Sequence, residues 1–294
     1  MINWMKYRIA YFVVSVSMIL LGIFGLTLWK LNLGVDFTGG TIIEYSFDKP
    51  ISTEEVTKNL SEKEIPISAI QAVGENRYLF RMPPISTEEK SSLNTSLDEI
   101  FTDNSYNELR FETVGPAIGS ELIKKTIYAA IVAATAILLW VAIQFKSVKF
   151  GTTAILAMFH DTFILIGSFS VFGHLWQAEV DFLFVTALLT TLSFSVHDTI
   201  VVYDRIRESQ RKLGGSLREI ANKAITETMV RSLNNSFTII FMLLALLLLG
   251  GSSVRWFATA LLVGTVLGTY SSPFVAVPLL VTWDELLEKL KKKK

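Results

Sequence analysis

The stretch that decides the fold reads Phe194-Ser195-Val196-His197-Asp198-Thr199-Ile200-Val201-Val202. It belongs to a mostly apolar segment, Phe182 to Ile206, that is long enough to cross a bilayer. Carrying a carboxylate into hydrocarbon costs roughly 2.5 kcal/mol or more, so such a residue normally faces the interior of a helix bundle and handles an ion or a proton. Asp198 therefore indicates a membrane protein that is coupled to an energy source.

The composition supports a polytopic α-helical membrane protein. The chain has 294 residues, of which 51% are hydrophobic and 18% are charged, and its mean hydropathy is +0.45. A formal net charge of zero argues against nucleic-acid binding. The absence of cysteine excludes disulfides and thiolate metal sites, and the three histidines lack ligand-like spacing. We therefore expect no metal, no cofactor and, without a nucleophile paired with a base, no enzymatic activity.

Six apolar runs of about 20 residues, the length that a bilayer core requires, predict six transmembrane helices. They are Ile9–Trp29, Thr126–Phe145, Phe150–Phe172, Phe182–Val202, Leu233–Leu249 and Trp256–Val281. The first run is too long for a signal peptide and lacks a cleavage site of small residues, so we interpret it as an uncleaved anchor.

The short loops predict the orientation, because Lys and Arg mark the cytoplasmic side. Lys146 and Lys149 lie between the second and third runs, and a basic loop at about 203–230 lies between the fourth and fifth. Both termini are then cytoplasmic. The predicted parts are residues 1–30 with the first helix, a five-helix region at 122–283, and a basic tail at 284–294. That tail either binds anionic lipid or only fixes the topology.

The polar region 31–121, between the first two helices, is predicted to be an extracytoplasmic α+β domain. The sequence Ile51-Ser52-Thr53-Glu54-Glu55 recurs as Ile85-Ser86-Thr87-Glu88-Glu89, and in both copies a Ser precedes a Glu by three positions, as in a capping box. Expected strands are 41–47, 67–73, 77–82 and 108–114. The order β-α-β-β-α-β is that of a ferredoxin-like domain.

The segment Gly34-Val35-Asp36-Phe37-Thr38-Gly39-Gly40 joins the first helix to this domain. Paired glycines adopt backbone angles that other residues avoid. We interpret Gly34, Asp36, Gly39 and Gly40 as a tight turn or hinge that positions the domain. Ligand binding is the alternative.

Polar residues within the apolar runs predict a connected intramembrane site. His160-Asp161 lies near the middle of the third run and His197-Asp198 nearer the inner end of the fourth; because these helices are antiparallel, the two acids can lie at similar depths. Ser195 shares a helix face with Asp198. The predicted proton relay is Asp198, Arg231, His197, Asp161 and His160.

The fifth and sixth runs are expected to complete this polar seam. Arg231, Asn234, Asn235 and Thr238 fall on one side of a helix. Gly264 and Gly268 form a G-x-x-x-G pattern for close helix packing, and Pro273 predicts a kink. The alternative is that these charges form a structural ion pair that fixes helix packing.

Taken together, the motifs resemble the SecD/SecF family of bacterial protein translocase subunits, within the resistance-nodulation-division superfamily, and its SecF members in particular. The motifs are Gly34 to Gly40, Val114-Gly115-Pro116, His160-Asp161, the run from Asp198 to Glu208, Arg231, and Gly268-Thr269 to Ser272. The resemblance implies half of a twelve-helix unit in the bacterial cytoplasmic membrane. SecD would supply the other half, beside the SecYEG channel and the SecA motor.

The resemblance also implies that the proton-motive force assists preprotein translocation and release, with Asp198 and Arg231 matching the functional acid and arginine of the family. The family usually has Asn where this chain has His197, which is either an extra proton site or, as we prefer, a replacement hydrogen-bond donor. Two alternatives remain: half of an exporter of small molecules or lipids, and a passive membrane scaffold. Whether the coupling ion is H⁺ or Na⁺ stays open.

Overall fold

The computed structural model describes residues 2–102, 104–145 and 147–292. The chain forms two compact units, one of Met1–Asn32 with Tyr128–Lys294 and the other of Leu33–Ile127. Lys146 and the last two lysines of the basic tail lie outside the described residues. These lysines were part of the basis for the predicted orientation.

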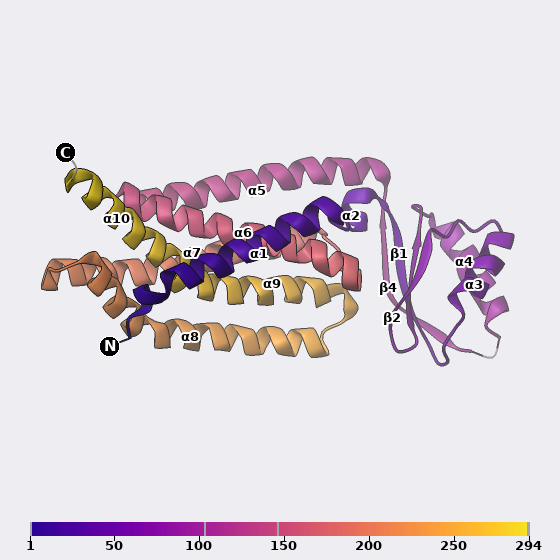
Figure 1. The fold of residues 1–294 in the computed structure, drawn as a ribbon. Coiled ribbons are helices and arrows are strands. Elements are labelled where there is room, and N and C mark those ends of the chain that lie inside the picture. The colour runs from indigo at the N-terminus through magenta and orange to yellow at the C-terminus, as the bar shows by residue number, and fades with distance from the viewer. Residues whose placement is uncertain (1, 103, 146, 293–294) are drawn as a thin grey trace. The chain divides into compact units, whose positions relative to one another are not determined.

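The larger unit, here called the membrane unit, is a bundle of long helices (Figure 1). The long helices of the chain are α1 (Arg8–Leu28), α5 (Pro116–Phe145), α6 (Val148–Trp176), α7 (Phe182–Leu213), α8 (Leu217–Leu249), α9 (Ser252–Ser271) and α10 (Val277–Lys292). Six helical segments in the described residues are long and apolar enough to cross a membrane, with α9 and α10 forming one of them. The six predicted spans are therefore present, and the chain is a multi-pass membrane protein.

The predicted loop at 203–230 is wrong, because almost all of it is helical. Helix α7 continues to Leu213 and α8 already begins at Leu217, with a turn at Gly214 and Gly215 at φ of 63° and 100°. Ion pairs along and between these helices stabilise the charged segments. They join Arg205 to Glu208 and Glu227, Arg207 to Asp204, and Lys212 to Glu208. Charge ended the apolar runs in the sequence without ending the helices.

Both ends of the described chain and the turn between α7 and α8 lie at the same end of the membrane unit (Figure 1). Ahead of α1, a short 3₁₀ helix at Trp4–Tyr7 packs on α8. The Trp4 indole donates to the Thr226 hydroxyl at 2.9 Å, and the Met5 amide donates to the Asn222 side chain at 2.9 Å. Arg8 of α1 pairs with Glu285 of α10 at 2.7 Å. These contacts hold the two ends of the chain together.

Close glycine contacts position α1 against α6. A Cβ atom on Gly167 of α6 would lie 2.4 Å from the Cα of Gly22 of α1, a separation at which backbone must move. Small residues allow helices in lipid to approach closely enough for van der Waals contact. No local sequence pattern marks this pair.

Gly167→Ala is expected to destabilise the membrane unit by about 1–3 kcal/mol, because the added methyl group forces two packed backbones apart. Gly151→Ala, in the same helix, is the matched control because its Cβ atom would meet nothing within 4 Å. The thermal unfolding midpoint in detergent should fall for the first variant and hold or rise for the second. Equal midpoints would contradict the packing account.

The predicted kink at Pro273 is a π-helical segment, Ser272–Ala276, between α9 and α10. Proline lacks the backbone donor that a regular helix needs, so the hydrogen bonds there are rearranged. In this region Ser271 and Ser272 are both buried and face neighbouring helices.

The smaller unit contains a four-stranded antiparallel sheet with the strand order β2-β3-β1-β4. Its elements are β1 (Gly40–Phe47), α3 (Thr53–Glu62), β2 (Ala69–Gly74), β3 (Arg77–Met82), α4 (Thr87–Ile100) and β4 (Tyr106–Val114). Alternate β1 residues such as Ile43 and Tyr45 form a core with Leu60 of α3 and Leu93 of α4, so both helices cover one face. Ser52 and Ser86 cap these helices as predicted, and the reciprocal capping box is complete at Ser86 and Glu89.

The Gly34–Gly40 segment is a compact turn that leads into β1. A short helix, α2 (Val35–Thr38), follows Gly34, and Gly39 and Gly40 have φ of 72° and 127°, which glycine tolerates best. A Cβ atom on Gly119, in the first turn of α5, would lie 3.1 Å from the Phe37 carbonyl oxygen. The chain segments that enter and leave this unit therefore pack directly on each other.

Candidate functional site

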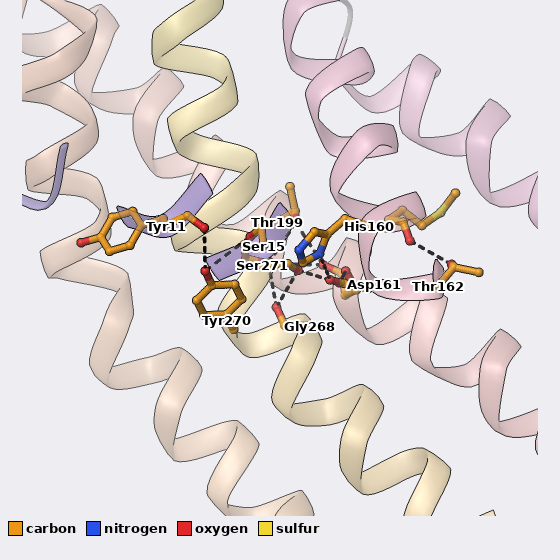
Figure 2. A network of polar contacts seen from close by, with 12 residues as sticks. Tyr11, Ser15, His160, Asp161, Thr162, Thr199, Gly268, Tyr270 and Ser271 are labelled. Atoms are coloured by element: carbon orange, nitrogen blue, oxygen red, sulfur yellow. Dashed lines mark hydrogen bonds and ion pairs between the residues drawn. The ribbon is translucent and has the colours of Figure 1, made fainter. Parts of the chain in front are cut away.

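Asp161 of α6 is fully buried and accepts hydrogen bonds from three side chains (Figure 2). The His160 Nδ1 lies 2.8 Å from one carboxylate oxygen, and the hydroxyls of Ser195 of α7 and Ser271 of α9 each donate to the other at 2.6 Å. Asp161 therefore joins three helices through one carboxyl group. Ser271 was missed in the sequence, where nothing distinguished it from the neighbouring polar residues of α9.

His160 completes this cluster on the side of α1. Its ring stacks against Tyr270 with centroids 6.4 Å apart, and the Tyr270 hydroxyl donates to the Tyr11 carbonyl of α1 at 3.2 Å (Figure 2). The His160 Nε2 atom is buried and has no hydrogen-bond partner among the described residues. An unpaired buried nitrogen is costly, so a polar partner is expected at this atom.

Asp198 of α7 is buried too, but it has a different partner. The Ser232 hydroxyl of α8 donates to one of its carboxylate oxygens at 2.6 Å. Among the described residues, the Asp198 side chain accepts this one side-chain hydrogen bond, whereas the Asp161 side chain accepts three. The two acids share no hydrogen-bond donor. Asp198 thus has more free acceptor capacity than Asp161, whose carboxylate already accepts three hydrogen bonds.

His197 is next to Asp198 in the sequence but points away from the bundle. Its Nδ1 atom lies 3.9 Å from the Asp198 carboxylate, beyond hydrogen-bond distance, and its side chain is 65% exposed. Consecutive helical residues point about 100° apart, so burying Asp198 turns His197 outward. Only the adjacent acid faces the bundle.

The polar face predicted for α8 is wrong in its direction. Arg231, Asn234, Asn235 and Thr238 are exposed on the outside of this chain. The face that meets the bundle carries Ser232 and Ser236 instead, and Ser236 shares a 2.6 Å hydrogen bond with Thr269 of α9. The prediction was based on long charged and amide side chains, whereas small hydroxyl side chains are the ones that fit between packed helices. The sequence feature that could have identified Ser232 and Ser236 is their four-residue spacing, which places both on one helix face.

Arg231 adjoins Ser232, the hydrogen-bond donor to Asp198. Among the described residues Arg231 makes no ion pair, although it lines a charged cleft between α7 and α8. Arg231 is therefore exposed to the cleft and is not held in a fixed salt bridge.

Gly264 and Gly268 bring α9 onto α7 beside the two acids. A Cβ atom on Gly264 would lie 2.2 Å from the Thr191 hydroxyl, and one on Gly268 would lie 3.1 Å from the Ser195 Cα. This approach places Ser272 within 2.9 Å of the Thr199 hydroxyl. In the part of the chain that the structure describes, no three His, Asp or Glu side chains form a metal-binding group.

Two family profiles match the chain. The one described as "Protein export membrane protein SecD/SecF, C-terminal" matches residues 93–286, and the "SecD/SecF GG Motif" matches residues 30–51. The second includes the glycine turn, and the first includes Asp161, Asp198 and the side chains that donate hydrogen bonds to them.

Similar proteins and structures bear related names. The protein translocase subunit SecF of Thermobaculum terrenum is 41% identical and covers 97% of this chain and 94% of its own length, and that of Vibrio alginolyticus is 38% identical over 94% and 87%. The crystal structure of SecDF from Thermus thermophilus has a TM-score of 0.85 at 35% identity. It covers 97% of this chain, which spans 39% of that longer protein.

Proposed function

The chain belongs to the SecD/SecF family of protein export membrane proteins, and from that membership we propose that it uses the proton-motive force to assist preprotein translocation and release. Asp198 is the proton-carrying group in this proposal. The observation that carries it is the bonding of this carboxyl: it is buried within the membrane unit, yet among the described residues a single hydroxyl donor holds it. Such a group can change protonation without breaking a large network.

The proposed partner is SecD, which would supply a second set of six helices. Relatives named SecDF carry a matching region within a chain more than twice as long. In addition, α7 exposes polar side chains at helical spacing within an otherwise apolar segment, namely Thr186, Thr190, Ser193 and His197. Polar groups facing lipid are unfavourable, so a polar or hydrated partner surface is expected to cover them. SecYEG, SecA and the preprotein follow from the same family role.

We place both termini in the cytoplasm of a bacterial cell and the smaller unit, as a ferredoxin-like domain, on the outer side of the cytoplasmic membrane. In this orientation the charged ends of α7 and α8 are cytoplasmic, in line with the positive-inside rule. The outer domain would act by contact with a client or partner, since its described residues include no catalytic group that we can identify. Asp161 and His160 would position the helices around Asp198 or hold a second proton.

Proton entry on the outer side and release on the inner side would drive the cycle. One elementary charge that moves through 100 mV releases about 2.3 kcal/mol, so a few protons can power a domain movement. Attraction by Arg231 would favour the ionised carboxylate and thereby the release step.

The test is preprotein release from sealed membrane vesicles with and without an imposed proton gradient. The proposal expects the gradient to accelerate release in vesicles that contain the protein and to have no such effect in vesicles that lack it. Exchanging sodium for potassium at constant pH should leave the rate of release unchanged if protons are the coupling ion. A protein that is coupled to sodium would lose the stimulation by the gradient. A second six-helix chain that copurifies would separate a half-unit from a self-sufficient exporter.

A further inference from the structure

A cleft of about 770 Å³ opens between the charged segments of α7 and α8. Its walls are Val201, Asp204, Arg205, Arg207, Glu208, Arg211, Lys212, Glu227, Thr228 and Arg231. Eight of these ten residues are charged, so the cleft favours water over lipid chains. The segments that line it, the last turns of α7 and the first turns of α8, lie at the end of the membrane unit that also holds both ends of the described chain (Figure 1).

A second, much smaller space lies directly against Asp198. It measures about 10 Å³, close to the minimum that holds one water molecule. Its walls include Asp198, its hydrogen-bond partner Ser232, and the buried Ser272 at the start of the π-helical segment. A water molecule there would have the carboxylate and hydroxyls as partners.

Val201 and Thr228 line both spaces. Val201 follows Asp198 by three residues on α7, and Thr228 precedes Ser232 by four on α8, so roughly one helical turn, about 5 Å, separates the acid from the cleft. The Thr228 hydroxyl donates to the Ala224 carbonyl at 2.8 Å and keeps its acceptor capacity. These two side chains are the ones that the walls of both spaces share.

We propose that this cleft is the aqueous exit through which the proton leaves Asp198 and that Val201 and Thr228 form its gate. The inference rests on the proton coupling proposed above and adds the route, its side and its narrowest point. The cleft also brings charged side chains together: Arg231 faces it beside Ser232, and Glu208 and Glu227 line it as ion-pair partners of Arg205. Widening the gap between α7 and α8 at this pair would join the two spaces.

The chain contains no cysteine, so a single introduced thiol is the only one in it, and labelling is measured on this chain after it is separated from its partners. Val201→Cys and Thr228→Cys are prepared in sealed vesicles containing the complete translocase and treated on either face with a membrane-impermeant, positively charged thiosulfonate. Phe241→Cys, an exposed apolar position on α8, is the control. Because the hydrated thiolate is the reactive form, the gate positions should react at least roughly tenfold faster than the control.

Reaction should occur from the face that holds the ends of the chain. Rates no faster than that of Phe241→Cys, or reaction only from the opposite face, would overturn the route. This labelling requires no gradient-driven activity, so a closed cleft would reject the exit while leaving the role of Asp198 intact.

A second measurement uses the same variants. Attaching the bulky cation at position 201 or 228 should stop gradient-driven release, whereas a small methylthio group at the same thiol should leave most of it. Full gradient-driven release after complete modification by the bulky reagent would show that protons leave by another path. Since the unmodified and methylthio forms are measured in the same preparation, a folding defect is visible separately.

Discussion

Asp198→Asn is expected to reduce gradient-driven preprotein release to the level measured without a gradient. Asparagine has nearly the same shape as aspartate and can still accept the 2.6 Å hydrogen bond from Ser232, so the packing of α7 on α8 should survive. It cannot ionise, and the proton cycle therefore stops. The measurement is the initial rate of preprotein release from vesicles, with and without an imposed gradient, at matched protein levels.

The control for this variant is Asp284→Asn, which also removes a carboxylate from the membrane unit. Asp284 pairs with Lys149 on the surface, away from the two buried acids. This variant should keep the stimulation by the gradient. A passive scaffold would tolerate both changes equally, so equal gradient dependence in Asp198→Asn and the parent protein would remove the proton role from Asp198.

Asp161→Leu is expected to have the largest effect on stability. Leucine has the same branched shape with bulkier methyl groups, and it removes the acceptor of the His160 and Ser195 side chains and the nearer acceptor of Ser271 in a buried site. Each unsatisfied buried donor costs about 1–3 kcal/mol, so the combined loss is comparable with the total stability of many domains. The thermal unfolding midpoint in detergent and the amount of protein in membranes should both fall sharply.

Two milder variants separate this effect from a general sensitivity of α6. Asp161→Asn keeps one acceptor oxygen, and Ser271→Ala removes one of the three donors, so both should lie between the parent protein and Asp161→Leu. If Asp161→Leu were as stable as the parent, the three short hydrogen bonds would contribute nothing to helix packing. If Asp161→Asn remained folded but lost gradient-driven release, Asp161 would join Asp198 as a second proton site.

The sequence alone predicted the membrane spans and the order of elements in the smaller unit, because both patterns extend over many residues. An apolar run that spans a bilayer is unambiguous, and the order of strands and helices in the smaller unit followed from alternating apolar residues and two serine caps. The ends of α7 and α8 were mispredicted for a physical reason: ion pairs such as Arg205 with Glu227 continue a helix beyond the apolar segment. The length of an apolar run indicates how much of a helix lies within the membrane, but it does not indicate the residue at which the helix ends.

The site was predictable in its acids and less so in their partners. A buried aspartate in an apolar run is costly and therefore conspicuous, which is why Asp161 and Asp198 were found. The side of α8 that meets the bundle depends on packing against α7 and α9. Ser232 faces Asp198 because its small side chain fits between the packed helices. The contact of Gly22 with Gly167 likewise joins residues 145 positions apart, by subtraction of their numbers, and no local pattern reveals such a pair.

The central claim is that the Asp198 carboxyl changes its protonation state during the cycle, and infrared difference spectroscopy tests it most directly. Spectra of the parent protein and of Asp198→Asn are recorded in oriented membranes across pH and with an imposed gradient. The account predicts a protonated-carboxyl band that appears and disappears with pH and gradient in the parent protein and is absent from the variant. A spectrum in which no carboxyl band assigned to Asp198 changes under any of these conditions would contradict it.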